Sequence, residues 1–240
     1  MAEFLVVIPT YNEAESIAGI IERTRAAIPS ADILVVDDAS PDGTGGIVEA
    51  MDDTAVHLLT RPGKDGLGRA YVAGFRWGLE REYRFLAEMD ADGSHDPADL
   101  PAMLATAIDR ADLVIGSRWV TGGSVHNWPR SRRLISRVGN VYSRWILGSR
   151  IHDITAGFRV YRAAAASGLV RHDIASQGYC FQVETAWRLE RSGAVVVEHP
   201  ISFTERVNGS SKMHTGIVVE ALLRVTGWGL TRPFRSRDLS

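Results

Sequence analysis

Short apolar runs alternate with longer amphipathic stretches along the first half of the chain. Five of the runs are bounded by Pro, Gly or Asp and predict strands over residues 4–8, 32–36, 55–59, 85–89 and 112–115. The stretches between them repeat apolar residues at helical spacing and predict helices over residues 13–28, 43–52, 66–81 and 97–109. This alternation predicts an α/β fold with a mostly parallel sheet and helices on both faces.

The pattern changes after about residue 117. Residues 118–133 are rich in Arg, Gly and Trp, residues 134–147 predict an amphipathic helix, and residues 216–230 predict an apolar one. No internal repeat, low-complexity tract or linker divides the chain. We therefore expect one domain over residues 1–240, with one half over about 1–117 and another over about 118–240.

Polar motifs follow three of the predicted strands directly. PTYNE follows the first strand, Asp37 and Asp38 follow the second, and Asp90-Ala91-Asp92 follows the fourth. In such sheets ligands bind beyond the carboxyl ends of the strands. Two carboxylates this close repel each other unless a cation lies between them. An exposed Asp-rich turn would also explain the pair. The pair is in register with two other strand-end motifs, however, which favours a nucleotide-sugar site with Mg²⁺ or Mn²⁺ on the diphosphate.

Composition limits the class of protein. With 45% hydrophobic and 23% charged residues the chain is globular, and its formal net charge of −2 gives no overall attraction to nucleic acid. Its one cysteine, Cys180, excludes an intramolecular disulfide and fits a reducing cytosol. No apolar run reaches the ~18 to 20 residues of a membrane span, and no basic region precedes the first strand. We expect a soluble or peripheral protein.

Nine blocks of sequence carry a family resemblance. VVIPTYNEAESI, ILVVDDASPDGT, GLGRAYVAGF, MDADGSHDP and VIGSRWVTGG together resemble family 2 glycosyltransferases of the GT-A fold. RRLISRVGNVYSRWILG, HDITAGFRVYR, SQGYCFQVE and PISFTERVNGSSKM are similar to polyprenol-phosphate mannose synthases, the dolichol-phosphate mannose synthase group. The blocks cover nearly the whole chain in order. The resemblance implies a nucleotide-sugar half, an acceptor half, and transfer of mannose from GDP-mannose to a polyprenyl phosphate with inversion at the anomeric carbon.

The resemblance also implies a donor site. Its residues, matched motif by motif, are Pro9, Tyr11, Glu13, Asp38, Asp90, Ala91, Asp92, Arg206 and Lys212. Asp38 is preferred to Asp37 for the base, although an Asx turn would also explain it, and Glu13 could be only a helix N-terminal acid. Arg206 and Lys212 match a loop that closes over the diphosphate in the family, and Gly209-Ser210-Ser211 would make it flexible.

The metal is expected on Asp90 and Asp92. Family members with a Gln two places after the second Asp use it as a further ligand. This chain has Ser94 there, so the third ligand stays open. His95 is interpreted as structural.

The acceptor site is expected on arginines. Arg118 and Arg132, with Ser136, match the positions that hold the lipid phosphate in the family, and Arg133 could replace Arg132. Guanidinium groups bind phosphate oxygens bidentately, although solvated surface charge would also explain these arginines. With Asp92, Arg118 and Arg132 form the predicted catalytic set. The acceptor phosphate is ionised near pH 7, so no strong general base is required.

Two helices could bind a membrane surface. The apolar positions are Leu134, Val138, Val141, Trp145 and Ile146 in the first helix and Ile217, Val218, Ala221, Leu222, Val225 and Trp228 in the second. Arg137 and Arg144 would lie near headgroups. Either stripe could instead pack on the sheet, and a membrane-protein partner could share the anchoring. We expect peripheral binding on the cytoplasmic face, because GDP-sugars are cytosolic.

Three other functions were weighed against this one. A polyprenyl-phosphate glucosyltransferase using UDP-glucose is the main alternative, since base and sugar specificity depend on few contacts. A carboxylate-pair hydrolase is disfavoured because Asp90 and Asp92 flank one backbone position instead of facing each other across a sugar. A non-catalytic membrane-recruitment module would not explain the acidic strand ends.

Overall fold

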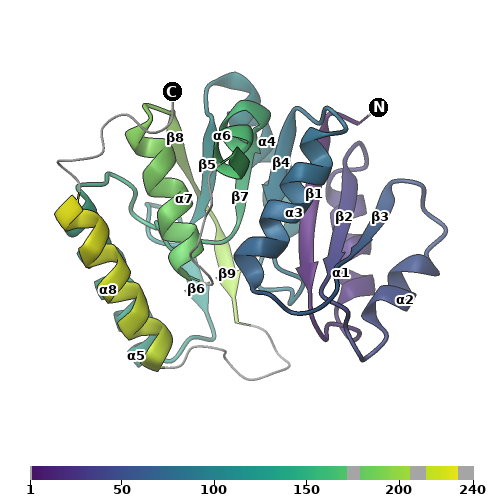
Figure 1. Ribbon diagram of the computed structural model, residues 1–240, viewed down its shortest axis with the longest axis horizontal. Coiled ribbons are helices and arrows are strands. Elements are labelled where there is room, and N and C mark those ends of the chain that lie inside the picture. The colour runs from purple at the N-terminus through teal and green to yellow at the C-terminus, as the bar shows by residue number, and fades with distance from the viewer. Residues whose placement is uncertain (1, 172–178, 206–214, 232–240) are drawn as a thin grey trace.

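The computed structural model describes residues 2–171, 179–205 and 215–231 (Figure 1). The strands are β1 (Phe4–Thr10), β2 (Asp32–Asp37), β3 (Val56–Thr60), β4 (Phe85–Glu88), β5 (Leu113–Ser117), β6 (Ser124–His126), β7 (Arg159–Arg162), β8 (Val196–Pro200) and β9 (Ser202–Thr204). Seven of them form one sheet in the order β3-β2-β1-β4-β7-β5-β8, and β6 pairs with β9. All pairs are parallel except those of β7. The predicted mostly parallel sheet is confirmed.

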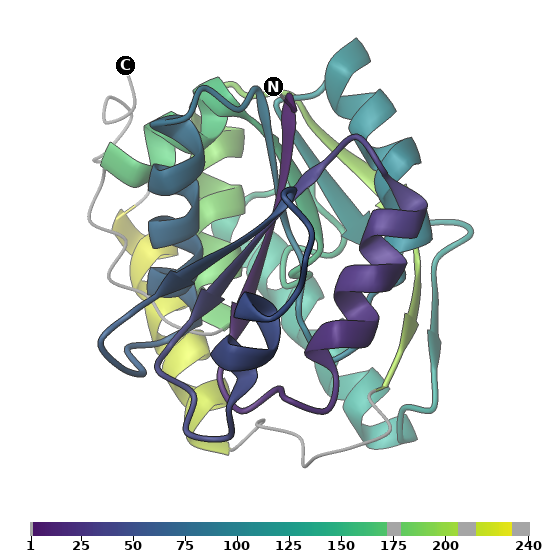
Figure 2. The ribbon, with the colours of Figure 1, turned by 90° about the vertical axis from the view of Figure 1, so that its right-hand side faces the viewer.

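Helices cover both faces of the large sheet. They are α1 (Ile17–Ala27), α2 (Thr44–Glu49), α3 (Leu67–Leu79), η1 (Pro97–Asp99), α4 (Leu100–Asp109), α5 (Arg130–Leu147), α6 (Ala163–Arg171), α7 (Tyr179–Arg191) and α8 (Thr215–Thr231). Figure 2 shows α1 and α4 on one side of the sheet and α3, α6 and α7 on the other.

Strand alternation creates the two cores. In β1, Leu5 and Val7 point to the core under α3, α6 and α7, while Val6 and Ile8 point to the core under α1 and α4. All four side chains are fully buried. Burying such side chains contributes about 1.5–3 kcal/mol each, so an all-apolar strand of this kind belongs in the middle of a covered sheet.

The antiparallel strand β7 was not predicted. It lies between β4 and β5, and Arg159 at its start pairs with Glu88 of β4 and Ile115 of β5. Because β7 runs against its neighbours, the segment that precedes it lies at the carboxyl end of β4 and β5. Residues 153–158 thereby lie at the same end of the sheet as the acidic motifs.

Some predicted element boundaries were wrong. Helix α1 begins at Ile17, four residues later than expected, because the backbone oxygen of Glu13 accepts hydrogen bonds from the N–H groups of Ser16 and Ile17 in a preceding turn. Glu13 is therefore not in the first helical turn. Helix α5 begins at Arg130, earlier than expected, so Arg132 and Ser136 lie within it.

Helices α5 and α8 run side by side in the same direction. Tyr142 Oη and Thr226 Oγ1 are hydrogen-bonded at 2.6 Å, and a Cβ at position 229 would lie 2.4 Å from Ile146 Cγ2. Gly229 therefore permits the close approach of the helices. Among the described helices, none has both the length and the apolar character that a membrane crossing requires.

Candidate active site

The carboxyl ends of β1 and β2 are joined by Asp37. Thr10 and Asp37 are register partners, and Thr10 Oγ1 donates a hydrogen bond to Asp37 Oδ1 at 2.8 Å. Ser40 donates its N–H to Asp37 Oδ2 at 2.9 Å and its hydroxyl to Asp37 Oδ1 at 2.6 Å. The carboxylate that holds the turn is thus that of Asp37, which leaves the neighbouring Asp38 for another role.

Asp38 forms an ion pair that the sequence did not indicate. Arg61 Nη1, just after β3, donates to Asp38 Oδ1 at 2.8 Å. Burial raises the pKa of Asp38, while the Arg61 charge opposes that rise. Nearby, Lys64 Nζ lies 4.3 Å from the centre of the Tyr11 ring. Asp38 and Tyr11 therefore lie beside basic groups at the end of the sheet where a nucleotide is expected.

Asp90 is hydrogen-bonded to a residue of α3. Tyr71 Oη donates to Asp90 Oδ1 at 3.0 Å, and burial raises the pKa of Tyr71 well above its ordinary value, so it remains a donor. The side chain of Ala91 is buried. Asp92 Oδ1 accepts the N–H of Ser94 at 3.0 Å and also the Ser94 hydroxyl. The N–H and the hydroxyl of Ser94 are thus hydrogen-bonded to Asp92, one of the two expected metal ligands.

His95 lies in an aromatic environment beneath this loop. Its ring stacks on Phe158, with centroids 5.0 Å apart, and meets Phe203 edge-on at 5.4 Å. Its Nδ1 is 3.3 Å from the backbone N–H of Asp90, which donates to it. Burial lowers the pKa of His95 to about 4, so the ring is neutral at neutral pH. These contacts support the interpretation of His95 as a structural residue.

The Asp90–Asp92 loop fits a hard divalent cation. Its donors are carboxylate oxygens, the ligands that Mg²⁺ and Mn²⁺ prefer. Gly157 leaves room beside them, since a Cβ there would lie 4.0 Å from Asp90 Oδ2. Within the described ranges, no group of three or more His, Cys, Asp or Glu side chains gathers as a metal cage. The arrangement suits a cation whose remaining ligands are water and substrate phosphate.

A buried polar cluster lies behind the loop and was not predicted. Tyr161 Oη donates to Glu88 Oε1 at 3.0 Å, and burial raises the pKa of Glu88 to about 7. Arg159 is fully buried and donates to the backbone oxygens of Ile154 and Ala156 at 2.9 and 2.8 Å. It therefore fixes the segment before β7, which supplies the next contact of the site.

Arg118 is locked to Asp153 of that segment. Arg118 Nε and Nη2 donate to the two carboxylate oxygens of Asp153 at 2.7 Å each, and the Arg118 N–H donates to the same carboxylate at 2.9 Å. Nη2 also reaches Thr155 Oγ1 at 3.0 Å. Both charged side chains are buried. Solvated surface charge is thus the wrong interpretation for Arg118.

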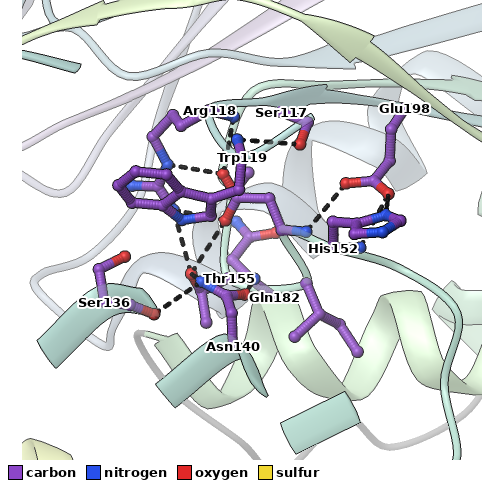
Figure 3. Close-up of polar contacts among 12 residues, drawn as sticks. Ser117, Arg118, Trp119, Ser136, Asn140, His152, Thr155, Gln182 and Glu198 are labelled. Atoms are coloured by element: carbon purple, nitrogen blue, oxygen red, sulfur yellow. Dashed lines mark hydrogen bonds and ion pairs between the residues drawn. The ribbon is translucent and has the colours of Figure 1, made fainter. Parts of the chain in front are cut away.

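Figure 3 shows how these elements converge. Ser117 and Arg118 come from the end of β5, Ser136 and Asn140 from α5, Thr155 from the segment before β7, and Gln182 from α7. Asn140 Nδ2 donates to the backbone oxygen of Ser136 at 2.9 Å and to Thr155 Oγ1 at 3.1 Å. Asn140 therefore links the expected acceptor residue Ser136 to the contacts of Arg118.

Arg132 lies near the same aromatic ring as Arg118. Its Cζ is 4.4 Å from the centre of the Trp128 ring, and that of Arg118 is 5.3 Å from the same ring. Arg132 Nη1 donates to Glu205 Oε1. Arg133, the alternative residue, instead donates to the backbone oxygen of Val125 at 3.0 Å. The structure thus brings Arg118 and Arg132 to one aromatic site, each beside a carboxylate.

Two expected donor residues lie outside the described residues. These are Arg206 and Lys212, together with the Gly209-Ser210-Ser211 stretch. Sequence reasoning also missed Arg61, Asp153 and Glu205. Asp153 lies in the HDITAGFRVYR block, but nothing in its local pattern indicated a partner 35 residues away.

Comparison with known proteins decides the family. The model of glycosyl transferase family 2 matches residues 5–169. The chain belongs to this family. The match spans both the strand-end carboxylates and Arg118, so the resemblance inferred from the motifs is confirmed.

Curated relatives of this family 2 member share about half of its residues. An undecaprenyl-phosphate mannosyltransferase of Micrococcus luteus is 55% identical over 94% of this chain and 93% of its own. A polyprenol monophosphomannose synthase of Mycolicibacterium smegmatis is 50% identical over 94% of this chain and 86% of its own.

Solved structures share the fold at low identity. Glucosyl-3-phosphoglycerate synthase from Mycobacterium tuberculosis, in complex with phosphoglyceric acid, has a TM-score of 0.65 and 16% identity, covering 93% of this chain and 80% of that one. Its complex with Mn²⁺, UDP and glucosyl-3-phosphoglycerate has a TM-score of 0.64 at 16% identity, covering 95% and 78%. The expected GT-A fold is confirmed.

Proposed function

We propose that this protein transfers mannose from GDP-mannose to a polyprenyl monophosphate, with inversion at the anomeric carbon. The observation that carries the proposal is the carboxyl end of the sheet, which presents the Asp90 to Asp92 loop and Arg118, while Arg132 of α5 lies beside the same Trp128 ring as Arg118. The names of the relatives from Micrococcus luteus and Mycolicibacterium smegmatis, at 55% and 50% identity, support mannose as the sugar and a polyprenyl phosphate as the acceptor.

The donor is assigned to the β1, β2 and β4 ends. Asp38 would accept hydrogen bonds from the base, and Pro9, Tyr11 and Glu13 would line the pocket beside it. Asp90 and Asp92 would hold Mg²⁺ or Mn²⁺, which offsets the charge that develops on the leaving diphosphate. The complex of the mycobacterial structural neighbour with Mn²⁺ and UDP supports a divalent ion in this fold.

The acceptor is assigned to Arg118, Arg132 and Ser136. An oxygen of the ionised lipid phosphate attacks the anomeric carbon, a C–O bond forms there, and the bond to GDP breaks with its electron pair on the diphosphate. Because the nucleophile is already an anion, the protein's part is to align two anions that repel each other. The buried Asp153 fixes the Arg118 guanidinium for that alignment.

A lipid acceptor requires a membrane-binding surface, which we assign to α5 and the exposed positions of α8. Leu134, Val138, Val141 and Trp145 form an exposed row on α5, with Trp145 78% exposed, and Ile146 packs inward on the core. On α8, Leu223 and Leu230 are exposed, while Val225 is buried and Trp228 stacks on Trp187 at 6.0 Å. The predicted face of α5 is therefore free to enter a bilayer surface, whereas Val225 and Trp228 of α8 pack inside the protein.

Of the other positions in the expected α8 stripe, Leu222 is 39% exposed. The side chains of Ile217, Val218 and Ala221 lie outside the described residues. We place the protein at the cytoplasmic face of the membrane, where a GDP-sugar is available, with or without a membrane-protein partner.

One assay tests the function. Purified protein is incubated with Mn²⁺, undecaprenyl phosphate in vesicles, and either GDP-mannose or UDP-glucose, and the glycolipid product is measured. We expect product from GDP-mannose and little from UDP-glucose. Product from UDP-glucose alone would establish the glucosyltransferase instead, and release of free sugar without glycolipid would contradict transfer.

A further inference from the structure

The two acceptor arginines have carboxylate partners of different kinds. Asp153 is fully buried, and Arg118 binds it through two guanidinium nitrogens, Nε and Nη2, and the backbone N–H. The side chain of Glu205 is 24% exposed and binds Arg132 through one guanidinium nitrogen. The first pair is built into the fold, whereas the second can open without burying an unpaired charge.

The Arg132 guanidinium is oriented by its surroundings, with Nη1 directed at Glu205. Its Nε is buried and has no hydrogen-bond partner among the described residues. The guanidinium also lies over Trp128, which fixes its plane. The carboxylate of Glu205 accepts from Nη1, where an oxygen of a phosphate could accept in its place.

The backbone at Glu205 is anchored although its side chain is accessible. The N–H of Glu205 donates to the backbone oxygen of His126 at 3.2 Å, at the end of the β6–β9 pair. A rotation about the side-chain bonds of Glu205 could therefore release Arg132 while the strand stays in place. The Glu205 carboxylate binds Arg132 as a phosphate would. Because both residues belong to the same chain, the effective concentration of this carboxylate at Arg132 is high.

We propose that Glu205 occupies the acceptor-phosphate position on Arg132 until the lipid phosphate displaces it. Glu205 is thus a positioning residue that competes with the acceptor, and this role rests on the proposed function. This competition weakens the binding of any anion to Arg132. Displacement of Glu205 costs the same free energy for inorganic phosphate as for a lipid phosphate, so removal of the Glu205 charge should strengthen the binding of both.

The test is the neutral, nearly isosteric substitution Glu205→Gln. Two probes separate the sources of phosphate: farnesyl phosphate as acceptor, and inorganic phosphate as inhibitor of mannose transfer. We expect the KM for farnesyl phosphate and the inhibition constant of inorganic phosphate each to fall by about fivefold, the effect of removing a partly exposed ion pair. The KM for GDP-mannose should stay at the wild-type value. Glu22→Gln, an exposed change on α1, removes the same charge elsewhere and should change neither constant.

A merely structural role for Glu205 would give the opposite sign. An unchanged or raised acceptor KM in a Glu205→Gln protein that melts like wild type would overturn the proposal. If Glu205→Gln does not fold, Glu205→Asp, whose shorter side chain reaches Arg132 poorly, must show the same fall in both constants or the proposal is wrong. Failure of the proposed function itself is distinguishable, because then the wild-type protein transfers no mannose to farnesyl phosphate.

Discussion

The backbone N–H of Thr204 donates a hydrogen bond to the carbonyl oxygen of Ser94 at 3.2 Å, which ties strand β9 to the loop of Asp92. Ser94 in turn donates its N–H to Asp92, and Glu205, the residue after Thr204, binds Arg132. The expected metal loop and the expected acceptor arginine are therefore joined through Thr204, the last residue of β9, and Glu205, which follows it.

Loss of either loop carboxylate should remove metal-dependent donor binding. Asp90→Asn and Asp92→Asn keep the shape of the side chain but remove the charge that a divalent ion requires. We expect the affinity for GDP in the presence of Mn²⁺ to fall at least about tenfold, to the value measured with chelator. Titration calorimetry of GDP with and without Mn²⁺ measures this without any turnover.

The control is Asp109→Asn, at the exposed end of α4. This substitution removes one carboxylate far along the chain from the loop. The variant should bind GDP in the presence of Mn²⁺ as the wild-type protein does. If Asp92→Asn retained the wild-type response to Mn²⁺, the assignment of the metal to this loop would be wrong.

Removal of Arg118 should weaken the fold as well as the acceptor site. Arg118→Ala leaves Asp153 buried without its partner, which costs about 3–5 kcal/mol. Arg132→Ala should cost no more than about 1 kcal/mol, because its partner Glu205 is partly exposed. Urea unfolding of the two variants measures the difference in the free energy of unfolding.

Equal stability losses in the two variants would contradict the distinction between the two ion pairs. The comparison also sets the conditions for kinetics, since Arg118→Ala must be assayed where it is folded. Under those conditions both variants should lose acceptor use while the affinity for GDP-mannose changes little. An equal loss of donor affinity would refute their placement in the acceptor site.

The five strands of the first half could be predicted because their signals are local, whereas the parallel strands β6, β8 and β9 were not predicted. Each strand of the first half is a short apolar run that ends in a polar motif, as Val7 and Ile8 precede PTYNE. Strand β7 could not be predicted in this way, because Arg159, its first residue, is a fully buried charge. Its burial depends on carbonyl groups of Ile154 and Gln182 that only the folded chain brings together.

The site was likewise predictable only in part. Asp90 and Asp92 follow β4, so the strand end was enough to select them, whereas Arg118, which follows β5, was selected through the family resemblance. Their partners Tyr71 and Asp153 come from elements 19 and 35 residues away, and no periodic pattern records such pairings.

Asp38 and Asp37 should separate on substitution. Asp38→Asn removes the carboxylate beside Arg61 that we assign to the base, and hydrogen bonds to a charged group contribute about 1.5–3 kcal/mol. We expect GDP affinity to fall by at least about tenfold. Asp37→Asn instead weakens the contacts to Thr10 and Ser40 and should lower the melting temperature more than it lowers GDP affinity. Calorimetry and thermal unfolding of both variants test the assignment, which a larger loss of GDP affinity in Asp37→Asn would reverse.

The exposed row of α5 should control binding to membranes. Trp145→Glu and Val141→Glu place a charge where an apolar side chain would enter the bilayer, and burial of each such side chain contributes about 1.5–3 kcal/mol. Arg130, Arg133 and Arg137 are exposed on the same helix and should attract anionic headgroups. We therefore expect wild-type protein to float with anionic liposomes, less so at high salt, and each variant to bind at least about tenfold more weakly.

Ile108→Glu on α4 is the matched control for this surface. Ile108 is 55% exposed. Helix α4 covers one face of the sheet, whereas α7, against which α8 packs, covers the other face. The control should therefore float like wild type, because it adds the same charge at an exposed apolar position away from α5. The mannose-transfer rate on undecaprenyl phosphate in vesicles should follow flotation, while the rate on farnesyl phosphate in solution should be unchanged in all three variants. Equal flotation of Trp145→Glu and wild type would show that α5 is not the membrane-binding surface, and a loss of the solution rate would show that the substitution had damaged the acceptor site itself.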